Sequence, residues 1–194
     1  MAARTPAPEM PGDRRSPRLR PGQLTTLGDW LPWAERQYAR HHVALGQMAT
    51  TVHDEALYLL LHTLHLPLDS KPAVLRRKLT VDEQARLAEI FRRRTTEHVP
   101  AAYLTHEAYL GEHRFFVDER VVIPRSYFLE LLPEQIPPWL PPGKPVKRAV
   151  DVCTGSGCLA ILLAHQFPAA KVDAIDLSPD ALAVANFNVA THHL

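Results

Sequence analysis

The sequence predicts an α/β fold preceded by a helical region, and three observations indicate this. Helix-capping patterns recur between residues 24 and 99. A short apolar strand around Val150 runs into a glycine-rich turn, and a second apolar strand, 171–175, follows one helix later. Strand, helix and strand in that order are typical of a parallel βαβ unit, so the chain is expected to end in an α/β sheet.

Residues 1–22 differ in composition from the rest of the chain. They hold five prolines and five arginines against two acidic residues, with almost nothing apolar to bury. This composition predicts a disordered basic tail. A solubilising extension is the simpler interpretation. Weak electrostatic contact with ribosomal RNA is the functional one, because arginines neutralise phosphates without fixed structure.

The next segment, 23–105, is predicted to be a small helical domain. Capping-box patterns place three helix starts after Thr26, Thr51 and Thr80. The helix over 56–64 is apolar nearly all round, which predicts a central place in a small bundle. The arginine run at 92–94 covers most of a helical turn and is interpreted as a solvated face in preference to a ribosome-binding patch.

Two connecting segments follow. Residues 107–123 alternate in polarity and predict a β-hairpin that turns near Asp118 and Glu119 and ends at Pro124, within a segment 106–132. Residues 133–145 contain six prolines and one glycine, which predicts a semi-rigid linker.

The glycine-rich turn carries the chemistry. Two glycines at the end of a strand permit positive φ and let a ligand approach the backbone, and an acid at the end of the next strand can accept both hydroxyls of a ribose. The sequence therefore predicts a nucleoside cofactor. The candidate binding residues are Asp151, Cys153, Thr154, Gly155, Ser156, Gly157 and Asp176.

Two cofactor classes fit this frame. Residues 155–160 match the G-x-G-x-x-A dinucleotide fingerprint, with an acid roughly 20 residues further on, so NAD is one alternative. However, Asp151 precedes the glycines, close to where a dinucleotide fold must accept a doubly negative pyrophosphate. S-adenosyl-L-methionine carries a positive sulfonium and no phosphate. The carboxylate therefore favours S-adenosyl-L-methionine.

Longer stretches of the chain resemble a known family. Residues 99–105 (VPAAYLT), 115–126 (FFVDERVVIPRS), 151–158 (DVCTGSGC) and 172–182 (VDAIDLSPDAL) together resemble the HemK/PrmB-like protein glutamine methyltransferases. Pro-Arg-Ser at 124–126 is closest to the branch that acts on large-subunit ribosomal protein L three. Enzymes of the release-factor branch usually have Pro-Arg-Pro-Glu-Thr-Glu there, so a release factor is the second possible protein substrate.

The resemblance implies a fold for the end of the chain and a role for each of its parts. Residues 146–194 would be the amino-terminal part of a seven-stranded, Rossmann-like S-adenosylmethionine methyltransferase domain, incomplete because they supply only two strands. Asp151 and residues 154–157 match the family's cofactor loop, and Asp176 matches its ribose-binding acid. Arg125 and Glu130 would close one side of the site, and the helical domain would contact the protein substrate.

The resemblance also bears on catalysis. In the family an Asn-Pro-Pro-Tyr loop binds the substrate glutamine amide, and this sequence contains no such motif. No catalytic residue is therefore assigned, and the chain alone is expected to be inactive. The alternatives are an NAD-dependent oxidoreductase and a non-catalytic ribosome-binding module.

Composition narrows the remaining possibilities. The two cysteines form no disulfide framework, and no apolar run approaches the length of a membrane span, so a cytoplasmic protein without membrane contact is expected. His62 and His65 lie three apart on a helix, but no third ligand is evident. We therefore expect no metal site.

Overall fold

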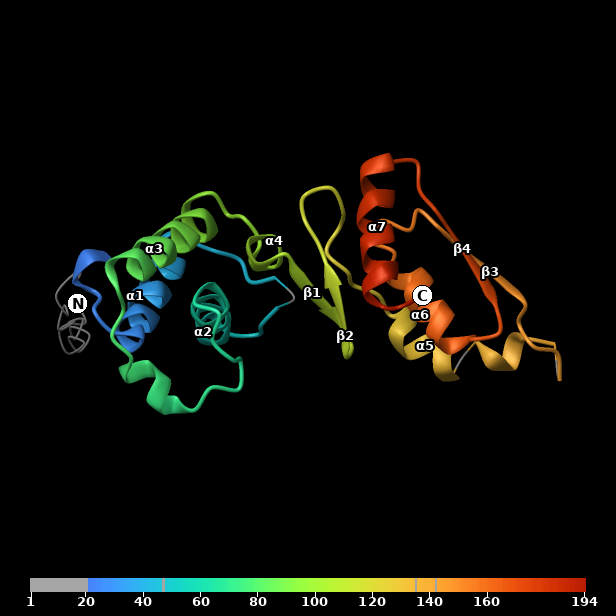
Figure 1. Ribbon diagram of the computed structural model, residues 1–194, viewed down its shortest axis with the longest axis horizontal. Coiled ribbons are helices and arrows are strands. Elements are labelled where there is room, and N and C mark those ends of the chain that lie inside the picture. The colour runs from blue at the N-terminus through green and yellow to red at the C-terminus, as the bar shows by residue number, and fades with distance from the viewer. Residues whose placement is uncertain (1–20, 47, 135, 142) are drawn as a thin grey trace, which may run out of the picture.

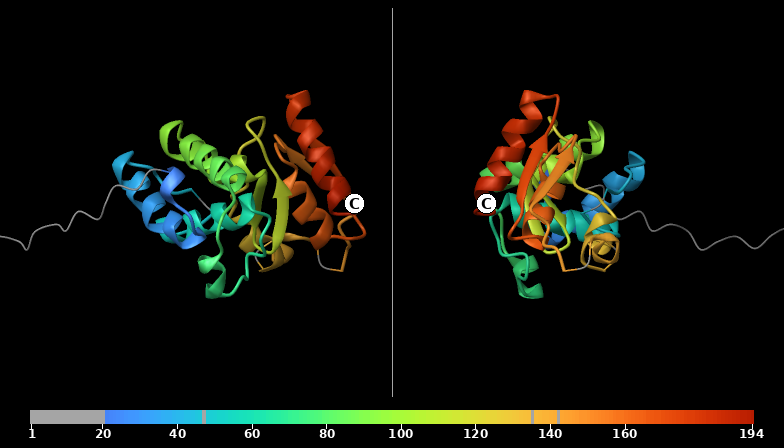
Figure 2. Two further views of the ribbon diagram at one scale, coloured as in Figure 1. Left: turned by 60° about the vertical axis from the view of Figure 1, so that its left-hand side comes forward. Right: turned by 90° about the vertical axis from the view of Figure 1, so that its right-hand side faces the viewer.

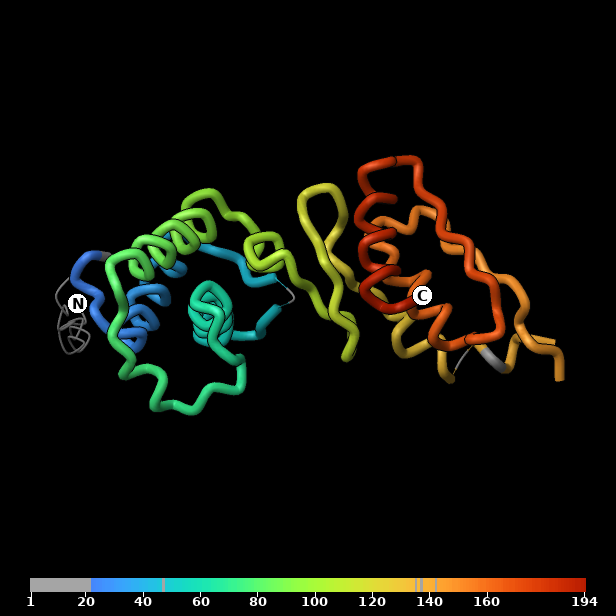
Figure 3. Tube along the Cα trace, viewed as in Figure 1, coloured from blue at the N-terminus to red at the C-terminus, as the bar shows by residue number. Residues whose placement is uncertain are grey.

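The computed structural model describes residues 21–46, 48–134, 136–141 and 143–194. A helical part and an α/β part lie at opposite ends of the molecule, with a β-hairpin between them (Figure 1). The backbone passes once from the first part through the hairpin to the second (Figure 3). The predicted tail 1–22 lies outside the described residues, apart from its last two, which begin the 3-10 turn Pro21–Gln23.

The helical part begins its main helices where the capping patterns predict. The Asp29 carboxylate accepts the Thr26 N–H at 2.8 Å, and the Glu83 carboxylate accepts the Thr80 N–H at 2.9 Å. The Thr51 hydroxyl accepts from the Asp54 N–H at 3.1 Å. These bonds satisfy amides that a helix start leaves unpaired, so the three predicted starts are confirmed. The helices are α1 (Leu27–Arg40), α2 (Val52–Thr63), α3 (Val81–Thr96) and α4 (Ala101–Thr105), with a 3-10 turn at Pro72–Arg76.

Helix α2 lies at the centre of this part, as its apolar sequence predicts. It contacts α1, α3 and α4, and its Leu59 and Leu60 are fully buried. Trp30 of α1 stacks on Phe91 of α3 with 6.0 Å between the ring centroids. The indole N–H of Trp30 donates to the Leu24 carbonyl at 3.2 Å, so this large side chain is buried without an unpaired donor.

The prediction of a solvated face at residues 92–94 is wrong for Arg94, whose side chain is buried. Its Nε donates to Glu55 at 2.6 Å and its Nη2 to the Ala44 carbonyl at 2.7 Å. Tyr38 donates to the same Glu55 oxygen at 2.8 Å. Helical periodicity explains the error, because Arg94 lies three residues after a fully buried phenylalanine and faces the core with it.

Two arginines of the helical part whose side chains reach solvent, Arg92 and Arg77, are paired with carboxylates. Arg92 bonds Glu89 at 2.7 Å and Glu97 at 2.6 Å, and Arg77 bonds Glu83 at 2.6 Å. These pairs neutralise the positive charges of Arg92 and Arg77, which could otherwise attract a phosphate backbone. The preference for a solvated face over a ribosome-binding patch therefore fits Arg92.

A hairpin connects the two parts, but its turn is not where the sequence predicts. Strands β1 (Glu107–Leu110) and β2 (His113–Phe116) pair antiparallel around Gly111. Gly111 has a φ of 61°, which suits the first central position of a two-residue hairpin turn. Residues 118–121 do form a hydrogen-bonded turn, in which the Val121 N–H donates to the Asp118 carbonyl at 3.1 Å, but this turn follows β2 and does not connect the two paired strands.

The α/β part follows the predicted order. Helix α5 (Phe128–Glu134) includes the first two residues of the predicted linker, which continues through a 3-10 turn at Pro137–Trp139. Strands β3 (Arg148–Val152) and β4 (Lys171–Ile175) pair in parallel and lie side by side in Figure 2, with α6 (Cys158–Gln166) connecting them and α7 (Pro179–Thr191) after β4. The predicted α/β class is confirmed for this part. Within the described ranges, no helix has the length and apolarity needed to cross a membrane.

The buried Arg94 gives a stability prediction. We expect Arg94→Ala to lower the free energy of unfolding by about 3 to 5 kcal/mol, because it leaves the Glu55 charge buried without its partner. Arg92→Ala is the matched control two residues away. It should change stability by less than about 1 kcal/mol, since its pairs are exposed. Urea unfolding measures the free energy of unfolding of both variants. Equal losses of stability would contradict the assignment of Arg94 to a buried ion pair and of Arg92 to exposed ones.

Candidate functional site

A pocket of about 380 Å³ opens at the carboxyl ends of β3 and β4, where α/β folds bind their ligands. The glycine-rich loop forms one wall and the segment after the hairpin forms the other. The lining residues are residues 120–125, Asp151, Cys153, Thr154, Gly155, Ser156, Cys158, Leu159, Asp176, Ser178 and Ala181. Six of the seven predicted binding residues thus lie together; the exception is Gly157.

The two glycines of the loop have different roles. Gly155 has a φ of 53°, and a Cβ added there would meet nothing within 4 Å, so it leaves open space at the pocket. Gly157 has a φ of 80°, and a Cβ there would lie 3.1 Å from the Ala185 Cβ. Gly157 therefore allows α7 to pack closely against the loop, and does not itself make room for a ligand.

Asp151 ties the loop to helix α6. Its Oδ2 accepts the Thr154 hydroxyl at 2.6 Å and the backbone N–H of Ala160 at 3.1 Å. The second bond satisfies an amide in the first turn of α6, whose N-cap is Gly157 and which has no side-chain cap of its own. A carboxylate from the preceding strand thus caps the helix at the edge of the pocket.

Asp176 holds the loop from the other strand. One carboxylate oxygen accepts the Gly155 N–H at 2.8 Å and the other accepts the Ser178 N–H at 2.9 Å. These two donors, Ser178 first, hold the pKa of Asp176 below its usual range, so the group is ionised at neutral pH. Each carboxylate oxygen keeps a lone pair that can accept from a ligand hydroxyl.

Asn188 is a structural residue of the site that sequence reasoning missed. Its Nδ2 donates to the Ser156 carbonyl at 2.9 Å and to the Phe116 carbonyl at 3.0 Å, and its Oδ1 accepts the Phe116 N–H at 2.7 Å. One buried amide therefore joins α7, β2 and the glycine loop. A signal was available, because Asn188 falls seven residues after Ala181 in the buried stripe of α7.

The segment after the hairpin supplies the second wall. Arg125 lines the pocket, as the family resemblance implies, together with Val122 and Ile123, which sequence reasoning did not assign. Glu130 does not line it; with Arg125, Ser126 and Tyr127 it lines a neighbouring hollow. Glu130 therefore does not form part of the wall of the cofactor pocket, whereas the resemblance implies that it does.

Comparison with known proteins identifies proteins that are similar to most of this chain. Residues 125–194 match the model of the methyltransferase small domain. The ribosomal protein uL3 glutamine methyltransferase of Neisseria gonorrhoeae is 46% identical over 172 residues, covering 89% of this chain and 58% of that protein. The enzyme of the same name from Bordetella pertussis is 49% identical, covering 89% of this chain and 58% of its own length. The chain is similar to the uL3 glutamine methyltransferases over 89% of its length. The predicted family resemblance is thereby confirmed.

This chain spans a little under three fifths of the length of the uL3 glutamine methyltransferases that it matches. The relative from Burkholderia pseudomallei shows the same relation, with 48% identity over 87% of this chain and 55% of that enzyme. All three relatives are named as methyltransferases. They give no support to the oxidoreductase or the non-catalytic ribosome-binding module considered above.

The two glycines should respond differently to alanine. We expect Gly157→Ala to cost about 2 to 4 kcal/mol of stability, because it combines left-handed strain with a close contact to Ala185. Gly155→Ala should cost only about 1 kcal/mol, since its surroundings are open. Chemical unfolding of both variants tests this. A larger loss at Gly155 would refute the assigned roles.

Proposed function

We propose that these residues form the cofactor-binding and substrate-recognition parts of an S-adenosylmethionine-dependent protein glutamine methyltransferase that acts on ribosomal protein uL3. The observation that carries the choice of cofactor is the cap of α6 by Asp151. The choice of substrate rests on the names of the relatives, which are uL3 glutamine methyltransferases.

The cap of α6 argues against a dinucleotide. A pyrophosphate bound by this loop would need free amides at the start of the following helix. Here the Ala160 amide already donates to Asp151, and that carboxylate would repel the two phosphate charges at short range. A sulfonium ligand carries the opposite charge and needs no such amides. The same motif that matches a dinucleotide fingerprint therefore fits S-adenosylmethionine better.

The remaining lining residues suit the same cofactor. Asp176 would accept the ribose hydroxyls through the free lone pairs of its carboxylate, and Gly155 would leave space for the ligand beside the backbone. Cys153 and Thr154 complete this wall of the pocket. When bound, S-adenosylmethionine supplies an activated methyl group on its sulfonium. The protein's own part is to bind and orient it.

Methylation of a glutamine side chain poses a positioning problem. The amide nitrogen is a weak nucleophile because its lone pair is delocalised, so catalysis would depend on orientation and directed hydrogen bonds. We assign no catalytic residue among the 194, which contain no Asn-Pro-Pro-Tyr. We expect this chain alone to bind cofactor without transferring methyl to uL3 in an assay with radiolabelled S-adenosylmethionine; transfer would contradict this.

Several finer features belong to the proposal. Strands β3 and β4 would be two strands of a seven-stranded sheet, and the helical domain 23–105 would contact uL3. The hairpin segment 106–132 and the linker 133–145 would connect this helical domain to the methyltransferase domain, which begins at residue 146. A release factor as substrate and a weak contact of the tail with ribosomal RNA stay predictions of the sequence.

Cofactor binding tests the site directly. We expect Asp176→Ala to weaken S-adenosylhomocysteine binding by about 10- to 100-fold, because hydrogen bonds to a charged group contribute about 1.5 to 3 kcal/mol. Titration calorimetry measures this, with NAD titrated into the unmodified protein in parallel. If the unmodified protein bound NAD but did not bind S-adenosylhomocysteine, the proposed function would be overturned.

Asp173→Ala is the matched control for this experiment. Asp173 lies on β4 three residues before Asp176, and its carboxylate pairs with Arg148 at 2.7 Å on the surface, away from the pocket. We expect this variant to bind S-adenosylhomocysteine like the unmodified protein. Equal weakening in both variants would show that Asp176 acts through the strand and not through the ligand.

The ionisation of Asp176 predicts how binding depends on pH. Its pKa in the folded protein lies below the ordinary value of 3.8, so the acceptor form is lost only as the pH falls through that lower pKa. We therefore expect no loss of S-adenosylhomocysteine affinity attributable to Asp176 between about pH 8 and pH 5. Calorimetry across this range, comparing the unmodified protein with Asp176→Asn, checks the prediction. A loss of S-adenosylhomocysteine affinity over this pH range that the unmodified protein shows and the Asp176→Asn variant does not would contradict the prediction.

A further inference from the structure

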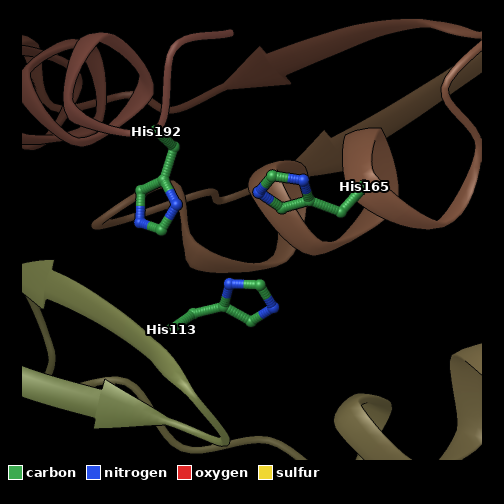
Figure 4. Close-up of side chains that lie close together, drawn as sticks. All are labelled: His113, His165 and His192. Atoms are coloured by element: carbon green, nitrogen blue, oxygen red, sulfur yellow. The ribbon is translucent and has the colours of Figure 1, made fainter.

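Three histidines from distant parts of the sequence meet on the side of the α/β part. His113 begins β2, His165 lies near the end of α6, and His192 follows α7. One ligand atom from each lies within 4.8 Å of the others. In Figure 4 a ring nitrogen of each histidine faces the space between the three rings.

A hydrogen bond fixes which nitrogen of His192 is available. Its Nε2 lies 2.9 Å from the Arg114 carbonyl oxygen, which can only accept, so Nε2 carries the hydrogen. In the neutral ring the lone pair is then on Nδ1, the nitrogen that Figure 4 shows toward the other rings. Metal-binding histidines typically have such an arrangement, with the second ring nitrogen donating to a backbone carbonyl.

The surroundings hold the rings in place. Phe115 stacks on His192 with 5.0 Å between centroids, and His113 stacks on His165 at 5.0 Å. Below them Phe115 and Ile161 are buried in an apolar cluster, while His165 is exposed, so the site is open to solvent on one side. The nearby guanidinium of Arg114 is paired with Glu107 at 3.0 Å, which keeps its charge engaged elsewhere.

The surroundings of His165 also favour the neutral form that binds metals. Burial, and then the neighbouring His113 and His192, lower the pKa of His165. Tetrahedral zinc with bonds of 2.0 to 2.1 Å needs ligand nitrogens about 3.3 Å apart. The nitrogens need to approach by at most about 1.5 Å from the 4.8 Å limit, which small side-chain rotations can supply.

We propose that His113, His165 and His192 form a Zn²⁺ site, with water as the fourth ligand, that fastens the hairpin to helices α6 and α7. Three neutral imidazoles and an open position suit zinc and exclude Mg²⁺ and Ca²⁺, which prefer oxygen ligands. Sequence reasoning considered His62 and His65 instead. His62 lies 3.7 Å from Glu107, and neither joins this cluster.

Zinc binding by the chelator-treated protein, without a polyhistidine tag, tests the proposal. We expect one Zn²⁺ per chain by titration calorimetry and no heat of binding with Mg²⁺. With Zn²⁺ at about a hundred times its Kd, the unfolding temperature should rise by roughly 5 to 10 °C. Co²⁺ in place of Zn²⁺ should give the intense visible absorption of tetrahedral coordination. Absence of Zn²⁺ binding would overturn the proposal.

Two variants show whether these histidines are the ligands. We expect His165→Ala, at an exposed position that the fold tolerates, to weaken Zn²⁺ binding more than about tenfold and to remove the tetrahedral Co²⁺ spectrum. His193→Ala is the matched control: it is adjacent to His192, exposed and outside the cluster, and should bind Zn²⁺ unchanged. Equal Zn²⁺ affinity in both variants would place the metal elsewhere and refute the site.

Discussion

The pocket depends on one constraint: the polar backbone groups of the glycine-rich loop must be satisfied while the loop stays open to a ligand. Side chains from three elements meet this requirement. Asp151 binds the Thr154 hydroxyl and the start of α6, Asp176 accepts the Gly155 amide, and Asn188 donates to the Ser156 carbonyl. A loop held in this way is ordered before a ligand arrives, so binding need not supply the entropy of ordering it.

The same constraint couples the pocket to the hairpin. Asn188 of α7 bonds the backbone of Phe116, and His192, four residues later at the end of that helix, bonds the backbone of Arg114, two residues before Phe116 on β2. The helix and strand periods each place such a pair on one face, so α7 and β2 are joined along their length. The segment after β2 is thereby delivered to the pocket as its second wall.

The helical part is coupled to this wall as well. The hydroxyl of Tyr103, in α4, donates to the Val121 carbonyl at 2.7 Å, and Val121 lines the pocket. Tyr58 of α2 bonds the Thr105 hydroxyl at 3.1 Å, next to the start of β1. A protein bound on the helical part would thus lie on elements that lead directly to the pocket wall, which suits the proposed recognition of a protein substrate.

Patterns among neighbouring residues predict the helix starts and strands well. The features that the sequence did not predict depend on contacts between distant segments. The caps at Thr26, Thr51 and Thr80 and the strand 171–175 depend on neighbouring residues, which the sequence displays. The three-histidine cluster depends on how distant elements pack, and no local pattern contains it. Arg94 is intermediate: its place on the face of Leu87 and Phe91 was visible, but the run of arginines suggested solvent.

The glycine motif shows why a fingerprint alone does not choose a cofactor. Gly155 provides space and Gly157 provides close packing with Ala185, and both requirements belong to the backbone geometry of the turn, whatever ligand lies above it. The discriminating group is the acid before the glycines. Because Asp151 occupies one amide of α6 that a phosphate would use and places a negative charge beside it, the helix start disfavours anions while the pocket beside it stays open. A cationic sulfonium is the ligand for which that arrangement carries no electrostatic penalty.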